Sequence, residues 1–316
     1  MKRHRRLSLL ILILLTIGIV GSWMFWPRGI KVTAARPEVG GWSPDVLTAQ
    51  VGEPLALRFT AEDMMHGFAV GGTEWEPVDI PPGETTEVTL VFDQPGTYTF
   101  YCTRFCSVNH WRMRGTIEVV GDAQELPAAV DPPLYVELNL DIDVPHPAEI
   151  VFGERPDAGR GTTLDVEVPP QYLARETYIE LAPVQVWQQL REEPETETLS
   201  DAELWDLVAT IWQAQATPET LAQGEQLYKD NCMSCHGPGG QGDGPIVSAL
   251  ETAVPDFTDP TNMLGASSAL LHGKIIRGGM GTGMPNWGAI FTEKQTWALI
   301  DYLWTFQFGK PESVSP

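Results

Sequence analysis

The chain has 316 residues, 43% of them hydrophobic, so it is long enough for two or three packed domains. Seven of its 20 basic residues lie in residues 1–36, which contain no acidic residue. The rest of the chain therefore has 13 basic and 42 acidic residues, a net charge of −29. A body this acidic repels nucleic acid and anionic lipid, which excludes nucleic-acid binding, and it suits a basic redox donor protein unless the charge only confers solubility.

The N-terminus combines a basic tail with a long apolar segment. Residues 1–6 (MKRHRR) precede an apolar run over 7–26, where about 20 residues rising ~1.5 Å each reach roughly 30 Å, the thickness of a membrane's hydrocarbon core. The basic tail favours a cytoplasmic N-terminus, and Trp23 and Trp26 suit the far interface. Thr33–Ala35 is a poor signal-peptide cleavage site, so we expect an uncleaved transmembrane helix rather than a removed signal. Both alternatives place the following domains on the periplasmic or extracellular side, and the uncleaved anchor makes a single-pass cell-membrane protein.

Residues 42–120 have the pattern of a small β domain. Apolar and polar residues alternate in VLTAQVGEPLALRFTAED (46–63) and in TTEVTLVFDQPGTYTFYC (85–102), where Asp93–Gly96 is a turn between two strands. GTIEVV (115–120) adds a closing strand. Short strands separated by turn residues predict a β-sandwich.

One loop of this domain gathers soft metal ligands. The stretch YCTRFCSVNHWRMRG contains Cys102, Cys106, His110 and Met113, and thiolate, imidazole and thioether are the ligands of copper electron-transfer sites. One cysteine suffices for a mononuclear site, whereas two thiolates can bridge two copper ions. Each copper then needs its own imidazole, and His66 in EDMMHGFAV is the other histidine of the domain. A disulfide between the cysteines and a Cys2His2 zinc site are the alternatives, but neither uses the methionine.

The pattern Cys-x-x-x-Cys-x-x-x-His-x-x-Met, with a histidine upstream, closely resembles the binuclear CuA domain. This domain is a Greek-key cupredoxin of heme–copper oxidase subunit II and of nitrous oxide reductase, and the resemblance covers residues 42–120. It implies a dicopper centre with these ligands: His66 and His110 at the ends, Cys102 and Cys106 as bridges, Met113 as a weak ligand, and the backbone carbonyl of Arg104. Oxidase subunits usually have glutamate at the position of Arg104. The motifs HGF and MRG favour nitrous oxide reductase or short, single-span oxidase subunits. The Trp-Tyr-Trp stretch of long oxidase subunits is missing, which argues against docking of a conventional cytochrome c.

Residues 121–217 are acidic and rich in proline, with strand-like pieces such as LYVELNLDIDV (134–144). They contain neither cysteine nor methionine and a single histidine, His146, so we expect no redox chemistry there. The composition leaves three interpretations open: an acidic linker, an extension of the β domain, or a degenerate domain.

A repeat supports the last of these interpretations. LSDAELWDLVATIWQAQ (199–215) aligns without gaps with FTEKQTWALIDYLWTFQ (291–307). Each begins with a capping Ser or Thr followed by an acid, and then places Trp, Leu and Trp on one helical face. We favour a duplicated domain whose first copy has lost its cofactor, and the alternative is two amphipathic helices that pack together or match by chance.

Residues 218–310 read as helices joined by glycine-rich loops, and they hold the motif CMSCH. Cys232, Cys235 and His236 form the Cys-x-x-Cys-His pattern of c-type heme attachment, in which two thiols form thioethers and the histidine ligates iron. A redox dithiol lacks its usual βαβ setting here, and a zinc site lacks further ligands nearby.

This region resembles a class I cytochrome c domain over 218–310, in the helix before the motif, PDFTDP, GMPNW and the closing helix WALIDYLW. The resemblance implies one covalent heme c and a methionine before a proline as the sixth iron ligand, which is Met284. Met280 and His272 are the other candidates. Methionine–histidine ligation fills both axial positions and is typical of electron carriers. We read the three histidines left over from both sites (His4, His146 and His272) as surface or core residues.

Two one-electron sites on one chain, with no triad or phosphate loop, indicate an electron-transfer protein without a catalytic site of its own. The resemblance to cytochrome c-fused oxidase subunits implies that an external donor reduces the heme and that electrons pass through CuA to a membrane partner. That partner is expected to be subunit I of a heme–copper oxidase, a cytochrome c oxidase reducing dioxygen. The alternatives are an anchored redox shuttle for a nitrous or nitric oxide reductase or another respiratory reductase, and a copper delivery or storage protein.

Overall fold

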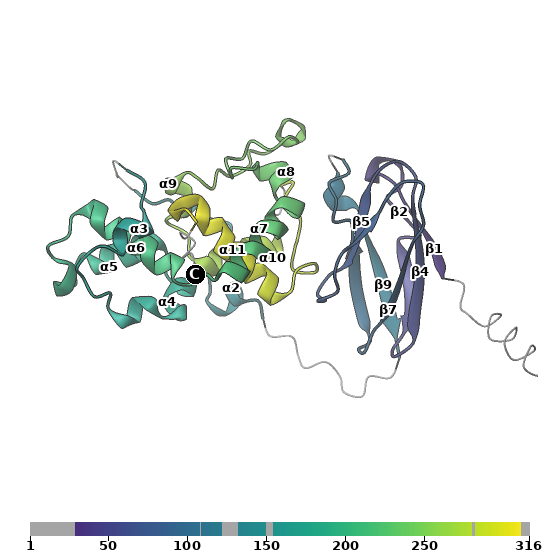
Figure 1. Cartoon of the computed structure of the whole chain (residues 1–316), viewed down its shortest axis with the longest axis horizontal. Helices are drawn as coiled ribbons and strands as arrows, with labels where there is room; N and C mark the ends of the chain where they lie inside the picture. Colours follow the sequence, from purple (N-terminus) through teal and green to yellow (C-terminus); the bar gives the residue numbers. More distant parts are fainter. Residues whose placement is uncertain (1–28, 108, 122–131, 150–153, 280–281, 311–316) are drawn as a thin grey trace, which may run out of the picture.

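The computed structural model describes residues 29–107, 109–121, 132–149, 154–279 and 282–310. The predicted tail (1–6) and anchor (7–26) lie outside these residues, so both remain predictions. Within the described ranges, no helix combines the length and apolar character that crossing a membrane requires. The chain forms a β domain followed by a helical region, in that order along the sequence (Figure 1).

The β domain is a sandwich of two sheets, as predicted. The first sheet has the strand order β2-β1-β4-β7 and the second β3-β9-β8-β5-β6. The first contains β1 (Ile30–Ala34), β2 (Trp42–Ser43), β4 (Pro54–Ala61) and β7 (Thr86–Val91). The second contains β3 (Val46–Gln50), β5 (His66–Val70), β6 (Val78–Ile80), β8 (Gly96–Tyr101) and β9 (Arg114–Val120), and the 3-10 turns η1 (Pro37–Val39) and η2 (His110–Arg112) lie in connections. Strand β1 precedes the predicted boundary at residue 42 and pairs in parallel with β4.

Aromatic residues fill the space between the two sheets. Alternate residues of β4 are buried, as the period of a half-buried strand requires. Phe59 of β4 lies against Phe68 of β5, with ring centroids 4.4 Å apart, and Trp42 makes edge contacts with both rings and with Phe100. These side chains form a core that belongs to the β domain alone.

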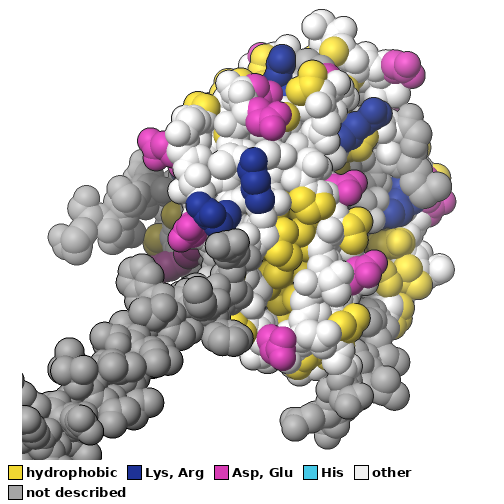
Figure 2. Space-filling view, turned by 90° about the vertical axis from the view of Figure 1, so that its right-hand side faces the viewer, with side chains coloured by type: hydrophobic (Ala, Val, Ile, Leu, Met, Phe, Trp, Pro, Cys, Tyr) yellow, Lys and Arg dark blue, Asp and Glu magenta, His cyan; other side chains and the backbone are white. Residues whose placement is uncertain are grey.

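The surface of the β domain that faces away from the helices carries a mixture of side chains. Figure 2 shows hydrophobic side chains forming a stripe in the middle of this face, with Lys, Arg, Asp and Glu around it. Both signs of charge are therefore present on this face, although the chain as a whole is strongly acidic.

The second half of the chain is helical, as predicted for residues 218–310. Its first part contains α2 (Leu134–Glu137), α3 (Ala158–Gly161), α4 (Arg175–Glu180), α5 (Pro183–Leu190) and α6 (Asp201–Gln213). Its second part contains α7 (Pro218–Asn231), α8 (Met233–His236), α9 (Pro260–Met263), α10 (Ser268–Arg277) and α11 (Glu293–Phe308). The 3-10 turns η3 (Pro170–Leu173), η4 (Pro194–Thr196) and η5 (Val247–Ala249) lie between helices. Helices α7 and α11 pack closely because Gly224 has no side chain: a Cβ there would lie 2.0 Å from the carbonyl oxygen of Ala298.

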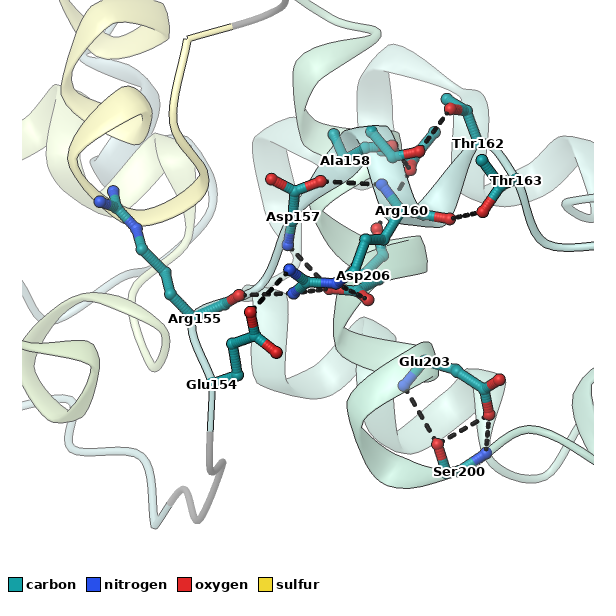
Figure 3. Close-up of polar contacts among 12 residues, drawn as sticks. Glu154, Arg155, Asp157, Ala158, Arg160, Thr162, Thr163, Ser200, Glu203 and Asp206 are labelled. Atoms are coloured by element: carbon teal, nitrogen blue, oxygen red, sulfur yellow. Dashed lines mark hydrogen bonds and ion pairs between the residues drawn. The ribbon is translucent and has the colours of Figure 1, made fainter.

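The described residues of 121–217 form helices that share one hydrophobic core with α7, α10 and α11. Helix α3 is fixed to α6 by a bidentate ion pair between Arg160 and Asp206, with both nitrogen–oxygen distances at 2.8 Å (Figure 3). Asp206 also accepts from the backbone N–H of Asp157, and its carboxylate is nearly inaccessible to solvent. This buried ion pair joins two helices of the middle region to each other.

The strand-like segment LYVELNLDIDV is not a strand. Its first residues form α2, and Asn139 then adopts a left-handed conformation (φ 51°) that ends the helix. Ile142 is buried, and its carbonyl accepts a hydrogen bond from Lys274 of α10 at 2.7 Å. Apolar residues at short spacing fit either a strand or a turn of helix. Here the contacts with α10 determine that the segment is not a strand.

The two repeated segments form α6 and α11, and both have capping boxes, at Ser200 and Thr292. The helices contact each other through Trp212 and Trp304, whose ring centroids lie 5.9 Å apart in an edge arrangement. The two amphipathic helices therefore pack together, as one of the two interpretations of the repeat predicted. The origin of the repeat by duplication remains a prediction.

Candidate metal centres

Three adjacent strands bring the predicted copper ligands to one end of the β domain. His66 is the first residue of β5, Cys102 follows the last residue of β8, and Met113 precedes β9. Strand β8 pairs antiparallel with β5 on one side and with β9 on the other, so these strand ends meet. The loop that joins β8 to β9 carries Cys106 and His110.

The five side chains converge in the interior, with exposed fractions from 0% for His66 to 7% for His110. Cys102 Sγ lies 3.7 Å from Nδ1 of His66, and Cys106 Sγ lies 3.6 Å from Nδ1 of His110. Met113 Sδ is 3.7 Å from Cys106 Sγ. Ligand atoms of His66, Cys102 and Cys106 all lie within 4.8 Å of one another. Each cysteine thus has its own imidazole, and the thioether approaches one of the two sulfurs.

Arg104 contributes to this loop in two separate ways. Its backbone carbonyl oxygen lies 3.2 Å from Cys102 Sγ, at the rim of the ligand cluster. Its guanidinium points outward and donates to both carboxylate oxygens of Asp79, at 2.8 and 3.1 Å. The side-chain charge is therefore neutralised next to the site, while the carbonyl faces the site.

The two loop cysteines are free and form no disulfide with each other. A hydrogen bond from Cys106 lowers the pKa of Cys102 to about 3 against the effect of burial, helped by His110 and His66. The pKa of Cys106 is raised, because its proton is held by Cys102 and because the thiol is buried. The protein alone therefore favours the charged form of Cys102 and the neutral form of Cys106, and the positive charge of a bound metal would favour a thiolate at both. The donor set of two sulfurs, two imidazoles and a thioether fits copper.

Asp63 orients the first imidazole. Its Oδ1 lies 2.8 Å from Nε2 of His66, which leaves Nδ1 of that ring directed at the sulfur cluster. Burial alone would raise the pKa of Asp63, but hydrogen bonds from His66 and from the backbone of Arg36 and Met64 lower it to about 2. Burial opposes charging of His66, but its contacts with Cys102 and Asp63 outweigh burial and raise its pKa. A carboxylate behind a ligating histidine fixes the tautomer and orientation of the ring.

Two further residues hold the loop between β8 and β9, here called the copper loop, in place. The backbone N–H of Gly67 points at Cys102 Sγ across 3.5 Å, and a Cβ at Gly67 would lie 2.1 Å from Oγ1 of Thr103. Trp42 Nε1 donates to the backbone carbonyl of Met113 at 3.1 Å. Glycine at position 67 therefore permits the close approach, and the buried indole positions the methionine.

The heme motif opens onto a cavity of about 350 Å³ in the helical region. Its walls include Cys232, Cys235, His236 and Met284, so the predicted attachment and ligand residues face one space. Most of the other lining residues are apolar or glycine: Ile142, Leu250, Ala253, Val254, Pro255, Gly278, Gly279, Gly283, Pro285 and Trp287. A cavity of this size and lining is typical of a cofactor site.

His236 is held in the form that binds a metal. Its Nδ1 lies 3.4 Å from the carbonyl oxygen of Pro255, and its ring stacks on Phe257 with centroids 4.3 Å apart. Burial lowers its pKa to about 4, so the imidazole is neutral at physiological pH. A neutral ring whose Nδ1 faces a carbonyl leaves Nε2 free as a ligand.

The surroundings of the two motif thiols do not favour a redox dithiol. Burial and the neighbouring Cys235 raise the pKa of Cys232 to about 12, and burial raises the pKa of Cys235. Reactive dithiols and zinc ligands need accessible thiolates, whereas thioethers carry no charge. The surroundings therefore suit covalent attachment of an apolar ring.

Of the other candidates for the iron ligand, Met280 lies outside the described residues. His272 is buried beside Trp297, with ring centroids 4.9 Å apart, and its Nε2 is 3.1 Å from Glu293 Oε2. It is absent from the cavity wall and packs as a core residue.

Comparison with known families matches each half separately. Residues 45–120 match the family "Cytochrome C oxidase subunit II, periplasmic domain", and residues 219–303 match "Cytochrome C oxidase, cbb3-type, subunit III". The chain joins a CuA-type cupredoxin domain to a cytochrome c domain.

Curated relatives cover the same two halves. A cytochrome c oxidase subunit 2 of Thermus thermophilus is 35% identical over 79 residues, 25% of this chain and 58% of that protein. A nitrous-oxide reductase of Cupriavidus necator is 34% identical over 27% of this chain and 13% of that protein. The cbb3-type cytochrome c oxidase subunit FixP of Bradyrhizobium diazoefficiens is 32% identical over 28% of each. The chain thus spans little more than half of the Thermus protein and far less of the other two.

Several residues that support the CuA-type site were missed by sequence reasoning. Asp63, Gly67 and Trp42 act on the ligands from outside the spacing motif. Asp63 lies three residues before His66 and Gly67 lies in the HGF motif, whereas no local pattern marks Trp42. In the cytochrome c domain, Phe257 of the PDFTDP segment stacks on His236, a contact that the resemblance alone does not predict.

Proposed function

We propose that the chain is a membrane-anchored respiratory electron-transfer protein, acting as subunit II of a heme–copper oxidase. The observation that carries the proposal is the presence of a buried cluster of two cysteines, two histidines and a methionine together with a Cys-x-x-Cys-His cavity on one chain. Residues 7–26 are assigned as the anchor, with both domains on the periplasmic or extracellular side.

In the CuA-type domain, Cys102 and Cys106 are assigned as bridges between two copper ions, and His66 and His110 as the terminal ligands. Met113 and the carbonyl of Arg104 complete the set. A dicopper centre of this kind supplies one-electron storage that changes little in geometry. The protein's part is to keep this ligand set buried, and Asp63 and Trp42 hold His66 and Met113 in position.

In the cytochrome c domain, Cys232 and Cys235 are assigned to covalent attachment of heme c, with His236 and Met284 as iron ligands. A six-coordinate heme supplies one-electron transfer without an open position for substrate. The largely apolar cavity wall suits the ring of a heme, and the carbonyl of Pro255 orients the His236 ring.

An oxidase partner is favoured because both halves match subunits of cytochrome c oxidases. The net charge of −22 suits a basic donor protein, whose encounter rate would fall as ionic strength rises. Partnership with a nitrous oxide reductase is the second candidate, since the copper region also matches those enzymes.

The test is gentle solubilisation of membranes, isolation of the full chain, and typing of hemes and metals in the eluate. The proposal expects two copper ions and one covalent heme c per chain, with a polytopic partner that carries non-covalent heme a, b or o. Covalent heme and copper without such a partner would support the shuttle, and one copper without the second thiolate bond would overturn the binuclear assignment.

A further inference from the structure

The CuA-type and cytochrome c domains touch along a surface that lies beside the two cofactor sites. The backbone N–H of Gly72, just after β5, donates to the carbonyl of Ile290 at 2.9 Å. A Cβ at Gly71 would lie 2.2 Å from the carbonyl oxygen of Ala289 and 2.8 Å from Cα of Ile290. The backbones of the two domains therefore lie in direct contact, and glycine at position 71 permits this approach.

Next to this contact, one side chain links the copper loop to the wall of the heme cavity. Arg114 directly follows Met113, and its Nη1 donates to the carbonyl of Asn286 at 2.9 Å. Its guanidinium lies 5.4 Å from the ring centroid of Trp287. Trp287 and Met284 both line the heme cavity. The contact between Arg114 and Trp287 therefore links the residue next to Met113 directly to the wall of that cavity.

The Arg114 contact is costly by itself. Its Nη2 is buried without a hydrogen-bond partner among the described residues. An unpaired buried donor costs stability, so its presence at this position calls for an explanation other than stability.

Two other contacts join the two domains next to Arg114 and Trp287. Tyr101, directly before Cys102, is buried and belongs to the same hydrophobic cluster as Trp287, although it lies in the β domain. On the rim, Arg104 lies 3.8 Å from Asp230, two residues before Cys232. Both partners of this ion pair are partly exposed, so it orients the domains more than it stabilises them.

We propose that these contacts form a preassembled interface within the chain, with Gly71, Arg114 and Trp287 at its centre, which holds the copper loop against the edge of the heme cavity. Arg114 and Trp287 are positioning residues in this arrangement. The role of this interface in electron transfer rests on the proposed function. There, ferrous heme would be oxidised to ferric heme by giving one electron to the copper centre, with no bond or proton exchanged. Because tunnelling falls steeply with distance, a fixed contact makes this transfer intramolecular and independent of encounters between chains.

The test compares Gly71→Ala with the wild type in the full, cofactor-loaded chain. The three atoms nearest to the added methyl group all belong to Ala289 and Ile290, so the variant conflicts with the other domain rather than with its own. Gly239→Ala is the matched control, since its Cβ would meet nothing closer than Gln241 Oε1 at 3.5 Å. Small-angle scattering and hydrogen exchange of the Gly72 amide report docking without any need for activity.

The expected result is a compact wild type with a protected Gly72 amide, and a Gly71→Ala variant with a larger radius of gyration and faster exchange. After rapid reduction of the heme, copper reduction should be first order in the wild type at every protein concentration, and about tenfold slower in the variant. Separated domains in the wild type, or a Gly71→Ala variant that matches it in all three readouts, would overturn the interface. Absence of heme c or copper from the wild type would instead refute the proposed function, while scattering and exchange would still test the docking.

Discussion

Asp63 Oδ1 lies 2.8 Å from Nε2 of His66, while Nδ1 of the same ring lies 3.7 Å from Cys102 Sγ. The imidazole is therefore held between a carboxylate and a sulfur, and its rotation is blocked from both sides. This arrangement exists without a bound metal, because the protein supplies all three groups.

The Asp63–His66 pair predicts a pH-dependent stability of the copper-free protein. The pKa of Asp63 is lowered from 3.8 to about 2, so its stabilisation is present above about pH 4 and is lost as pH falls through 2. The pKa of His66 is raised, so its stabilisation is full below about pH 6.5 and is lost as pH rises through the folded value. At pH 5, Asp63→Asn should cost roughly 2 kcal/mol in the free energy of unfolding.

Urea denaturation of copper-free wild type and Asp63→Asn between pH 2 and 8 measures this difference. The gap between the two proteins should be widest near pH 5 and should narrow toward either end. A gap that stays constant over the whole range would show that Asp63 acts only by packing. With copper present, the same variant should bind the metal about 10- to 100-fold more weakly, as loss of a carboxylate behind a ligating histidine usually does.

Replacing one bridge should abolish the binuclear site. In Cys102→Ser the proposed shared sulfur is lost, so copper content should fall below two per chain and the thiolate-to-copper absorption should change. Cys235→Ser is the matched control: it removes one thioether of the heme and should leave the copper spectrum unchanged, because the β domain has its own core. A fully active copper site in Cys102→Ser would contradict the bridging assignment.

Gly67 should be required by the copper loop for steric reasons. In Gly67→Ala the new methyl group would lie 2.1 Å from Thr103 Oγ1, so the loop must shift, at a cost of about 1–3 kcal/mol and with weaker copper binding. Adding Thr103→Ala removes the nearest atom and should recover part of both losses. The double-mutant cycle over unfolding and copper titration measures the coupling, and additive effects would show that the clash is not the cause.

The sequence predicted the parts of this protein that short-range patterns determine. Alternation in residues 46–63 and 85–102 predicted β3, β4, β7 and β8. The spacing in residues 102–113 predicted four ligands and the histidine count added His66, and the fold brings these five side chains together. Residues whose role depends on distant partners were not predicted: Trp42 reaches Met113 across the sandwich, and no local pattern marks that contact.

The middle region shows the same limit. Its proline-rich and acidic composition left a linker, an extension of the β domain and a degenerate domain open, and its described helices share a core with the cytochrome c domain. The burial of Asp206 depends on its ion pair with Arg160, 46 residues away in the sequence. Amino-acid composition does not show which charged residues pair with each other. The segment LYVELNLDIDV was misjudged for a related reason, since contacts with α10 outweighed a weak local preference.

Met284 should be the residue that closes the iron's second axial position. In Met284→Ala the proposed thioether ligand is removed from the cavity wall, so the heme should bind added imidazole readily and its reduction potential should fall. His272→Gln is the matched control, because His272 is the other described candidate yet is absent from the cavity wall and is held by Glu293. Imidazole titration of the heme spectrum, with potentiometry of both variants, measures the effect. If His272→Gln opened the iron to imidazole and Met284→Ala did not, the ligand assignment would be reversed, and the cavity would have to rearrange around α10 when heme is attached.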